Sequence, residues 1–148
     1  MKENKLPRGI RNNNPLNIRR GHLAWEGEVF GLEGVPLDTT FCQFKSMEWG
    51  WRAAFLLLRR YIEKYKCNTV RKIISRWAPS NENNTERYVR HVANSVAEGA
   101  DGEIEFKGAA ILLIASAMCE MENGIQYNPL TTTRALSAMI EGREMANK

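Results

Sequence analysis

The sequence lacks most of the residue patterns that support metal, nucleophilic or nucleotide chemistry. Its 148 residues include two histidines and three cysteines, and no two cysteines have CxxC spacing. Without a spaced cluster of Cys and His we expect no bound metal and no cofactor, and we predict reduced core cysteines. Neither Gly-x-Ser-x-Gly nor Gly-x-x-x-x-Gly-Lys-Ser/Thr occurs, which argues against a serine hydrolase and a phosphate-binding loop.

Long apolar runs and long basic runs are also absent. The main apolar stretch, Ala109 to Cys119, is shorter than the roughly 20 residues that cross a bilayer, so we expect no membrane insertion. The first 15 residues contain no apolar segment of a secretory signal, so we expect synthesis in the cytoplasm without a signal peptide. The net charge of +4 suits an anionic polymer, but the basic residues are too scattered for a dedicated nucleic-acid-binding protein.

The sequence does contain a series of helical patterns. Hydrophobic residues make up 43% of the chain, which is enough for one domain over residues 1–148. Apolar periodicity and capping residues predict helices that begin after Ser46, after Asn68-Thr69, at a Thr85 cap, after Gly108 and at a Thr133 cap. Glycines and an alternating pattern over residues 25–45 predict short strands, forming a small β-hairpin or sheet. The predicted fold class is therefore mainly α (α+β).

The helix predicted between Gly108 and Gly124 is the strongest candidate for a catalytic element. It is apolar on every side and ends with Glu120 and Glu122. A partly buried carboxylate at the C-terminal end of a helix has a raised pKa, as a general acid requires near neutral pH. Because the two acids lie about 200° apart around the helix, only one is expected to face a cleft. The alternative is a core helix whose last turn is solvated.

Amide and aromatic side chains are the other enriched types. The string Arg11 to Arg19 includes Asn12, Asn13, Asn14 and Asn17. It suits either a surface turn or a wall that hydrogen-bonds sugar hydroxyls and amides. Four tryptophans (Trp25, Trp49, Trp51 and Trp77) suit either sugar stacking or the core. The two histidines, His22 and His91, are expected at surface or packing positions. Together with the acids, these residues predict a glycan-cleaving enzyme.

Several other acids remain open as catalytic residues. Glu82 follows a Trp-Ala-Pro helix end and rivals Glu122, although a solvated loop acid has the same sequence pattern. Asp38 or Glu28, from the predicted β region, is a candidate second carboxylate for a mechanism that uses two. The choice between one and two carboxylates is not decided by spacing.

Three strings resemble parts of the lysozyme-like superfamily, in particular the soluble lytic transglycosylases. Asn84 to Val92, with Thr85, Tyr88 and Val89, is similar to their E-T-x-x-Y-V-x-x-V segment, whose Tyr lines the active cleft, although Asn84 stands in place of Glu. Ile114 to Gly124, followed by Asn128-Pro129, resembles the helix end that carries their catalytic Glu, with Asn123 in place of Ser. The third string, Asn13 to Arg19, resembles the N-N-x-x-G-I-K string of glucosaminidases, as does Phe41 to Ser46 their F-x-x-F-x-S.

Most of the chain also resembles a family of small prophage-encoded proteins labelled virion structural proteins. Their R-G-I-R-N-N-N-P-G-N-I string matches Arg8 to Ile18, with Leu16 in place of Gly, and their R-W-A-P-x-x-E-N-x-T-x-x-Y-V string matches Arg76 to Val89. Relative to the transglycosylases, the order of segments differs, because the Glu-bearing helix comes last. We therefore predict a circularly permuted lysozyme-like core in which Glu122 faces Asn13, Asn14 and Tyr88 across one cleft.

The predicted function is cleavage of the MurNAc–GlcNAc bond of peptidoglycan by a phage-associated lytic transglycosylase or lysozyme. Glu122 is the predicted acid/base, with Glu82 and Glu120 as rivals, and the predicted substrate-binding residues are Asn13, Asn14, Asn17, Trp25, Trp77, Thr85 and Tyr88. The expected partners are peptidoglycan glycan strands and other virion proteins, without nucleic acid. The expected site of action is the virion or the periplasm and cell wall. The alternative is a non-catalytic virion or wall-binding protein on the same scaffold.

Overall fold

The computed structural model describes residues 6–21, 24–34, 37–79 and 82–148, with the side chains of residues 82–83 excepted. Six α-helices occur in this described part: α1 (Arg8–Arg11), α2 (Met47–Arg59), α3 (Val70–Trp77), α4 (Glu82–Ala93), α5 (Ala109–Asn123) and α6 (Thr133–Ala146). A π-helical turn, η2 (Arg60–Lys64), extends α2. Three short 3-10 turns complete the list: η1 (Leu32–Gly34), η3 (Ile125–Tyr127) and η4 (Pro129–Thr131). The prediction of a mainly helical protein is confirmed.

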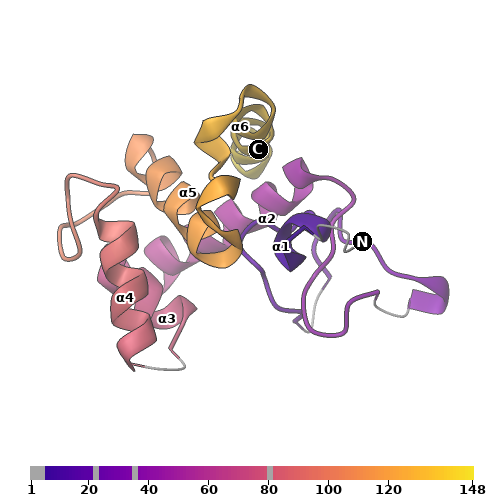
Figure 1. The fold of residues 1–148 in the computed structure, drawn as a ribbon, viewed down its shortest axis with the longest axis horizontal. Coiled ribbons are helices and arrows are strands. Elements are labelled where there is room, and N and C mark those ends of the chain that lie inside the picture. The colour runs from indigo at the N-terminus through magenta and orange to yellow at the C-terminus, as the bar shows by residue number, and fades with distance from the viewer. Residues whose placement is uncertain (1–5, 22–23, 35–36, 80–81) are drawn as a thin grey trace, which may run out of the picture.

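The long helices pack around α2 and α5 (Figure 1). Helix α6 lies along α2. Helices α3 and α4 form a pair, and α4 contacts α5. The close packing of α6 on α2 depends on Gly142, because a Cβ atom there would lie 2.4 Å from Cβ of Trp51. Trp51, Phe55 and Met118 are among the fully buried side chains of the resulting core. None of the helices in the described ranges is long and apolar enough to span a membrane.

The helix boundaries follow local sequence rules in most places. Ser46 occupies the N-cap position of α2, and the Thr69 hydroxyl caps α3 by accepting a hydrogen bond from the Lys72 amide at 3.1 Å. Helix α6 begins one residue earlier than predicted, because Thr132 rather than Thr133 supplies the capping hydroxyl. The predicted cap at Thr85 is wrong. Helix α4 already begins at Glu82, and the Thr85 hydroxyl instead donates to the carbonyl of Ala78 at the end of α3.

The predicted β-hairpin or sheet over residues 25–45 is not formed in the described part of that segment. Two isolated antiparallel bridges, Arg19 with Phe41 and Glu28 with Phe44, take its place. The physical reason is that side chains bind the backbone groups that a ladder would use. Asn14, for example, donates to the carbonyl of Cys42 at 2.9 Å. The segment projects from the helical body as an irregular arm, visible at the right of Figure 1.

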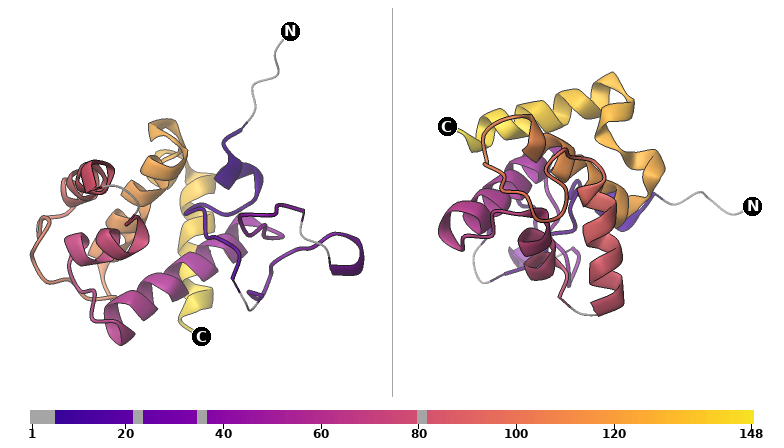
Figure 2. Two further views of the ribbon diagram at one scale, coloured as in Figure 1. Left: turned by 90° about the horizontal axis from the view of Figure 1, so that it is seen from below. Right: turned by 90° about the vertical axis from the view of Figure 1, so that its left-hand side faces the viewer.

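The two ends of the described chain lie on different sides of the molecule. In both views of Figure 2, α1 is well separated from the C-terminal end of α6. A circular permutation is simplest when the two termini lie close together. Relating this chain to a transglycosylase by permutation therefore requires a connecting segment, and the permutation stays a prediction.

Candidate active site

Glu122 lies in the last turn of α5, where two distant parts of the chain meet. Its Oε1 atom accepts a hydrogen bond from Nδ2 of Asn17 at 3.1 Å, and its Oε2 atom accepts one from the Tyr88 hydroxyl at 3.0 Å. The side chain of Trp77, at the end of α3, also acts on this carboxylate and helps to lower its pKa. Glu122 is thus bound by the N-terminal segment through Asn17 and by α4 through Tyr88, and Trp77 of α3 acts on its pKa.

The surroundings of Glu122 shift its proton equilibrium. Burial raises the pKa of Glu122, and the hydrogen bonds from Asn17 and Tyr88, the Trp77 side chain and the charge of Arg19 oppose that shift without reversing it. Tyr88 is itself buried, and burial together with the neighbouring Glu122 charge raises the pKa of its hydroxyl well above the ordinary value. The hydroxyl therefore stays protonated and donates to the carboxylate. This arrangement gives a carboxyl group that can hold a proton at a higher pH than a solvated glutamate.

The side chain of Asn17 is packed closely against the backbone of Gly9. A Cβ atom on Gly9 would lie 2.5 Å from Oδ1 of Asn123 and 2.8 Å from both Oδ1 of Asn17 and the carbonyl oxygen of Asn14. Oδ1 of Asn17 and Oδ1 of Asn123 have no conventional hydrogen-bond donor in the described structure. The Cα–H group of Gly9 is the group against which these oxygens pack. Asn17 also has a positive φ of 53°, which asparagine tolerates better than most residues.

The other asparagines of the N-terminal string bind backbone or a carboxylate rather than Glu122. Asn14 is fully buried, donates to the carbonyls of Ile18 and Cys42, and accepts from the Ile18 amide. Asn13 has a φ of 52° and donates to the Phe44 carbonyl at 3.0 Å. Of the residues predicted to face Glu122 across a cleft, Tyr88 therefore contacts it, whereas Asn13 and Asn14 shape the loop that presents Asn17.

Of the two rival acids, Glu120 has a described side chain and Glu82 does not. Oε1 of Glu120 lies 2.8 Å from Nε2 of His91, from which a carboxylate accepts a hydrogen bond, so both acids of the helix end meet side chains from α4. The side chain of Glu82 lies outside the described part of the structure, as does His22. Trp25 packs partly buried against the core, and its described contacts involve Glu28 rather than Glu122.

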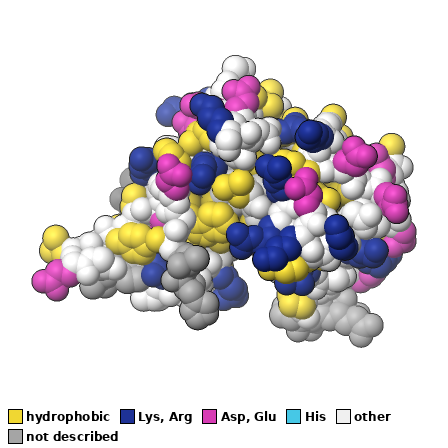
Figure 3. Space-filling model, turned by 180° about the vertical axis from the view of Figure 1, so that it is seen from behind, with side chains coloured by type: hydrophobic (Ala, Val, Ile, Leu, Met, Phe, Trp, Pro, Cys, Tyr) yellow, Lys and Arg dark blue, Asp and Glu magenta, His cyan; other side chains and the backbone are white. Residues whose placement is uncertain are grey.

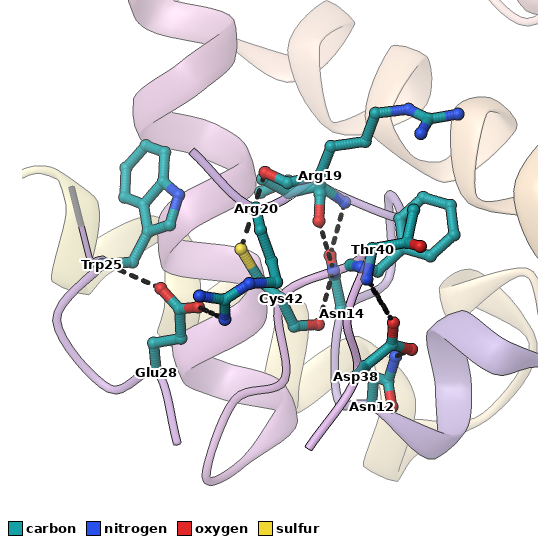
Figure 4. Close-up of polar contacts among 11 residues, drawn as sticks. Asn12, Asn14, Arg19, Arg20, Trp25, Glu28, Asp38, Thr40 and Cys42 are labelled. Carbon is teal, nitrogen blue, oxygen red and sulfur yellow. Dashed lines mark hydrogen bonds and ion pairs between the residues drawn. The ribbon is translucent and has the colours of Figure 1, made fainter. Parts of the chain in front are cut away.

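The two proposed second carboxylates are each bound by several donors (Figure 4). Asp38 accepts from the Arg8 guanidinium at 2.7 and 2.8 Å, from Asn12, and from the amides of Thr40 and Phe41. The Arg8 guanidinium above all holds the pKa of Asp38 well below its usual range.

Glu28 is equally enclosed, with a side chain that is 3% exposed. It accepts from Arg20 at 3.3 Å and from the Trp25 amide at 3.0 Å. In Figure 4 the guanidinium of Arg19 extends away from this network. Both carboxylates therefore serve to hold the irregular arm together.

A hollow of about 1080 Å³ lies elsewhere, between the start of α2, α6 and the η3–η4 segment. Trp51, Tyr127 and Pro129 contribute to its lining, and Glu48 and Glu141 stand at it. Glu122, Tyr88 and Trp77 do not line it. Size alone would favour this hollow, but the hydrogen-bonded and partly buried acid lies outside it, and we place the candidate active site at the acid.

Within the described ranges, no group of three His, Cys, Asp or Glu side chains is arranged to hold a metal ion.

Two contributors to the site were not recognised in the sequence. Asn123, adjacent to Glu122, donates to the Pro15 carbonyl at 2.8 Å and so joins α5 to the N-terminal loop. Arg19 is the cation whose charge acts on Glu122. Asn123 could have been identified from the sequence, because it is a polar residue directly after the candidate acid. Arg19 has no distinguishing local pattern.

Comparison with known proteins gives one informative match. No protein-family model matches the chain. The chain is 42% identical over 131 residues to Protein P5 of Pseudoalteromonas phage PM2, and the match covers 86% of this chain and 77% of that protein. The similarity therefore extends over most of the chain and associates it with a phage protein.

Proposed function

This chain belongs to the family of Protein P5 of Pseudoalteromonas phage PM2, and we propose that it is a phage-associated enzyme that cleaves peptidoglycan. The proposed bond is the MurNAc–GlcNAc glycosidic bond, and the proposed acid/base is Glu122. The proposed scaffold is a lysozyme-like core with its segments in permuted order. The proposed site of action is the virion or the cell wall, with glycan strands as the main partner and other virion proteins as further partners.

The environment of Glu122 is the observation that carries this proposal. A general acid for glycoside cleavage needs a carboxyl group with a raised pKa in a place where a sugar can reach it. Burial raises the pKa of Glu122. The hydrogen bonds from Asn17 and Tyr88 fix its orientation. A surface glutamate in a solvated helix end would have neither property.

In the proposed reaction, Glu122 acts first as an acid and then as a base. Its carboxyl proton passes to the glycosidic oxygen as the bond from that oxygen to the anomeric carbon of MurNAc breaks. The resulting carboxylate then takes the proton of the MurNAc 6-hydroxyl as that oxygen bonds to the anomeric carbon. Glu122 returns to its protonated form, and the product carries a 1,6-anhydro ring. In the hydrolytic version, water replaces the 6-hydroxyl.

The single-acid version is favoured because the other two candidate carboxylates are occupied. Asp38 has five donor contacts, including two from Arg8. Glu28 is bound by Arg20 and a backbone amide and is almost fully buried. A carboxylate that has to attack or stabilise an anomeric carbon needs an open face toward the substrate. Neither acid has one, which supports a transglycosylase over a two-carboxylate hydrolase.

Digestion of purified peptidoglycan by wild-type protein and by Glu122→Gln tests the proposal. We expect wild type to clear a peptidoglycan gel and the variant to lose about 10²- to 10⁴-fold in rate, the usual contribution of a general acid. Glu120→Gln is the matched control, since it removes a charge from the same helix end while leaving Asn17 and Tyr88 to bind Glu122. Clearing that persists in Glu122→Gln but is lost in Glu82→Gln would transfer the role to Glu82.

Mass spectrometry of the released fragments separates the two chemistries. Anhydro-muropeptides identify a transglycosylase, whereas reducing ends identify a hydrolase. No cleavage by pure, folded wild-type protein would support the second candidate, a non-catalytic virion or wall-binding protein. The occupied Asp38 and Glu28 and the phage relationship are compatible with that candidate, but it does not account for the hydrogen-bonded acid with a raised pKa.

A further inference from the structure

An aromatic strip continues from the candidate active site toward the surface of the molecule. Trp77, whose side chain helps to lower the pKa of Glu122, packs edge-on against Tyr61 with ring centroids 5.7 Å apart. Tyr61 in turn packs against Tyr65 at 6.3 Å. Tyr65 is 39% exposed. The strip therefore links the partly buried acid to solvent through a continuous series of ring contacts.

The unusual backbone of this region brings the two tyrosines together. Tyr61 lies in the π-helical turn η2 and Tyr65 directly follows it. A π-helical turn changes which residues share a face, and such turns occur frequently at functional sites. Lys66, the next residue, has a positive φ of 59° and ends the helical run. The turn is thus a local deviation that presents two aromatic rings toward α3.

Arg76 lies over both rings. Its Cζ atom is 3.9 Å from the centroid of Tyr65 and 5.4 Å from the centroid of Tyr61. In the described part of the chain no acidic side chain forms an ion pair with it, although other arginines such as Arg71 are paired twice. The rings therefore hold an exposed guanidinium in place without neutralising its charge.

The surroundings are suited to an anionic chain. Figure 3 shows a hollow between the projecting arm and the body that carries α3 and α4, and Lys and Arg side chains gather above it. Arg19, whose charge acts on Glu122, belongs to the N-terminal side of the acid, whereas Arg76 adjoins Trp77 on the α3 side. A stacked guanidinium can bind a carboxylate through two parallel hydrogen bonds.

We propose that Arg76, stacked on Tyr61 and Tyr65, is a specificity-determining residue that binds a carboxylate of a glycan strand whose scissile bond lies at Glu122. The proposal rests on the proposed function, because it assigns to Arg76 the lactyl or peptide carboxylate that distinguishes MurNAc from neutral N-acetylglucosamine. The rings position the guanidinium, and the guanidinium makes the contact with substrate.

Binding measurements with two glycans test this assignment. The probes are a MurNAc-containing peptidoglycan oligosaccharide and neutral chitotetraose, titrated in the Glu122→Gln background so that neither is cleaved. We expect Arg76→Met to weaken binding of the peptidoglycan oligosaccharide about tenfold and to leave chitotetraose binding unchanged, as for loss of one charge-assisted contact. Arg76→Lys keeps the charge without the planar fork and should give an intermediate loss.

Arg134→Met is the matched control for net charge. Arg134 is an exposed arginine at the start of α6, beside the separate 1080 Å³ hollow. The Arg134→Met substitution should leave the binding of both glycans unchanged. Equal losses for both glycans in Arg76→Met would overturn the assignment, because a residue that only supports the fold affects both. An unchanged affinity for the peptidoglycan oligosaccharide would also overturn it. If wild-type protein binds neither glycan, the proposed function itself fails.

Discussion

At the scale of single residues, the hydroxyl of Tyr88 is one of the two hydrogen-bond donors that ease the ionisation of Glu122. It donates a hydrogen bond to Oε2 of Glu122 at 3.0 Å and so stabilises the charged carboxylate. Tyr88→Phe removes that donor and keeps the ring, so the already raised pKa of Glu122 should rise further. A general acid works while protonated, so the fall in activity at high pH should move to higher pH. The measurement is the pH profile of kcat/KM.

The same substitution should lower the maximal rate by about tenfold, since one hydrogen bond that orients the acid is lost. Tyr61→Phe is a suitable control, because Tyr61 reaches the acid only through Trp77 and makes no described hydrogen bond to Glu122. A profile of Tyr88→Phe that shifts to lower pH, or that matches the Tyr61→Phe profile, would contradict this account of how Glu122 is tuned.

At the scale of elements, the contact between α1 and α5 holds the acid against the N-terminal loop. Gly9 in α1 leaves space for the side-chain oxygens of Asn123 and Asn17. Gly9→Ala places a methyl group within 2.5 Å of one and 2.8 Å of the other, so Asn17 should move away from Glu122. Overpacking of this kind costs about 1–3 kcal/mol. We expect a lower free energy of unfolding, measured by urea denaturation, together with weaker peptidoglycan clearing.

Gly21→Ala provides the comparison for that experiment. Apart from its chain neighbours, no heavy atom of the described residues lies within 4 Å of a Cβ atom at Gly21, so the substitution adds the same methyl group without a close contact there. Its stability and activity should match those of wild type. If Gly9→Ala is as stable and as active as Gly21→Ala, the close approach at Gly9 does not position Asn17.

The elements also differ in how far the sequence predicts them. Helices such as α2 and α5 follow from apolar periodicity, because their buried faces recur every 3.6 residues. The arm over residues 25–45 does not follow from its alternating pattern, because Asp38 and Asn14 bind the backbone groups that strands would pair. Glu122 could be identified from the sequence because it lies at the end of a clearly periodic helix. Arg76 could not, because its position depends on ring contacts with Tyr61 and Tyr65 that the π-helical turn makes possible. A local pattern reports periodicity, and these contacts join residues far apart in the chain.

At the scale of the whole molecule, the candidate site exists only where two parts of the chain meet. Asn17 reaches Glu122 across a separation of 105 residues, and Tyr88 reaches it across 34. The N-terminal loop, α3, α4 and α5 must therefore all be folded before the acid has its partners. Such a site fits the predicted permuted core, since the contacts depend on spatial position rather than on segment order. Because α1 and the C-terminal end of α6 are separated in Figure 2, a different segment order would need a segment that connects them.

The charge of the whole molecule leads to a prediction about retention on the cell wall. With a net charge of +4, the protein should be attracted to the anionic sacculus through solvent, and salt should weaken that attraction. Raising the ionic strength from about 0.1 M to about 1 M shortens the Debye length from about 10 Å to about 3 Å. In a co-sedimentation assay with purified sacculi and the Glu122→Gln variant, we expect the bound fraction to fall severalfold without reaching zero, because contacts with partly buried groups are screened less than those between exposed charges.

Chitotetraose binding in the same buffers is the control, and it should not change with salt because that glycan carries no charge. Duplex DNA serves as the competing anion. The basic residues are not gathered in a run, so DNA at equal charge concentration should release little protein from sacculi. Sacculus binding that does not respond to salt would show that net charge plays no part in retention. Complete release by DNA would instead show that the protein binds polyanions in general. A preference for sacculi over DNA requires a site that recognises sugar as well as charge.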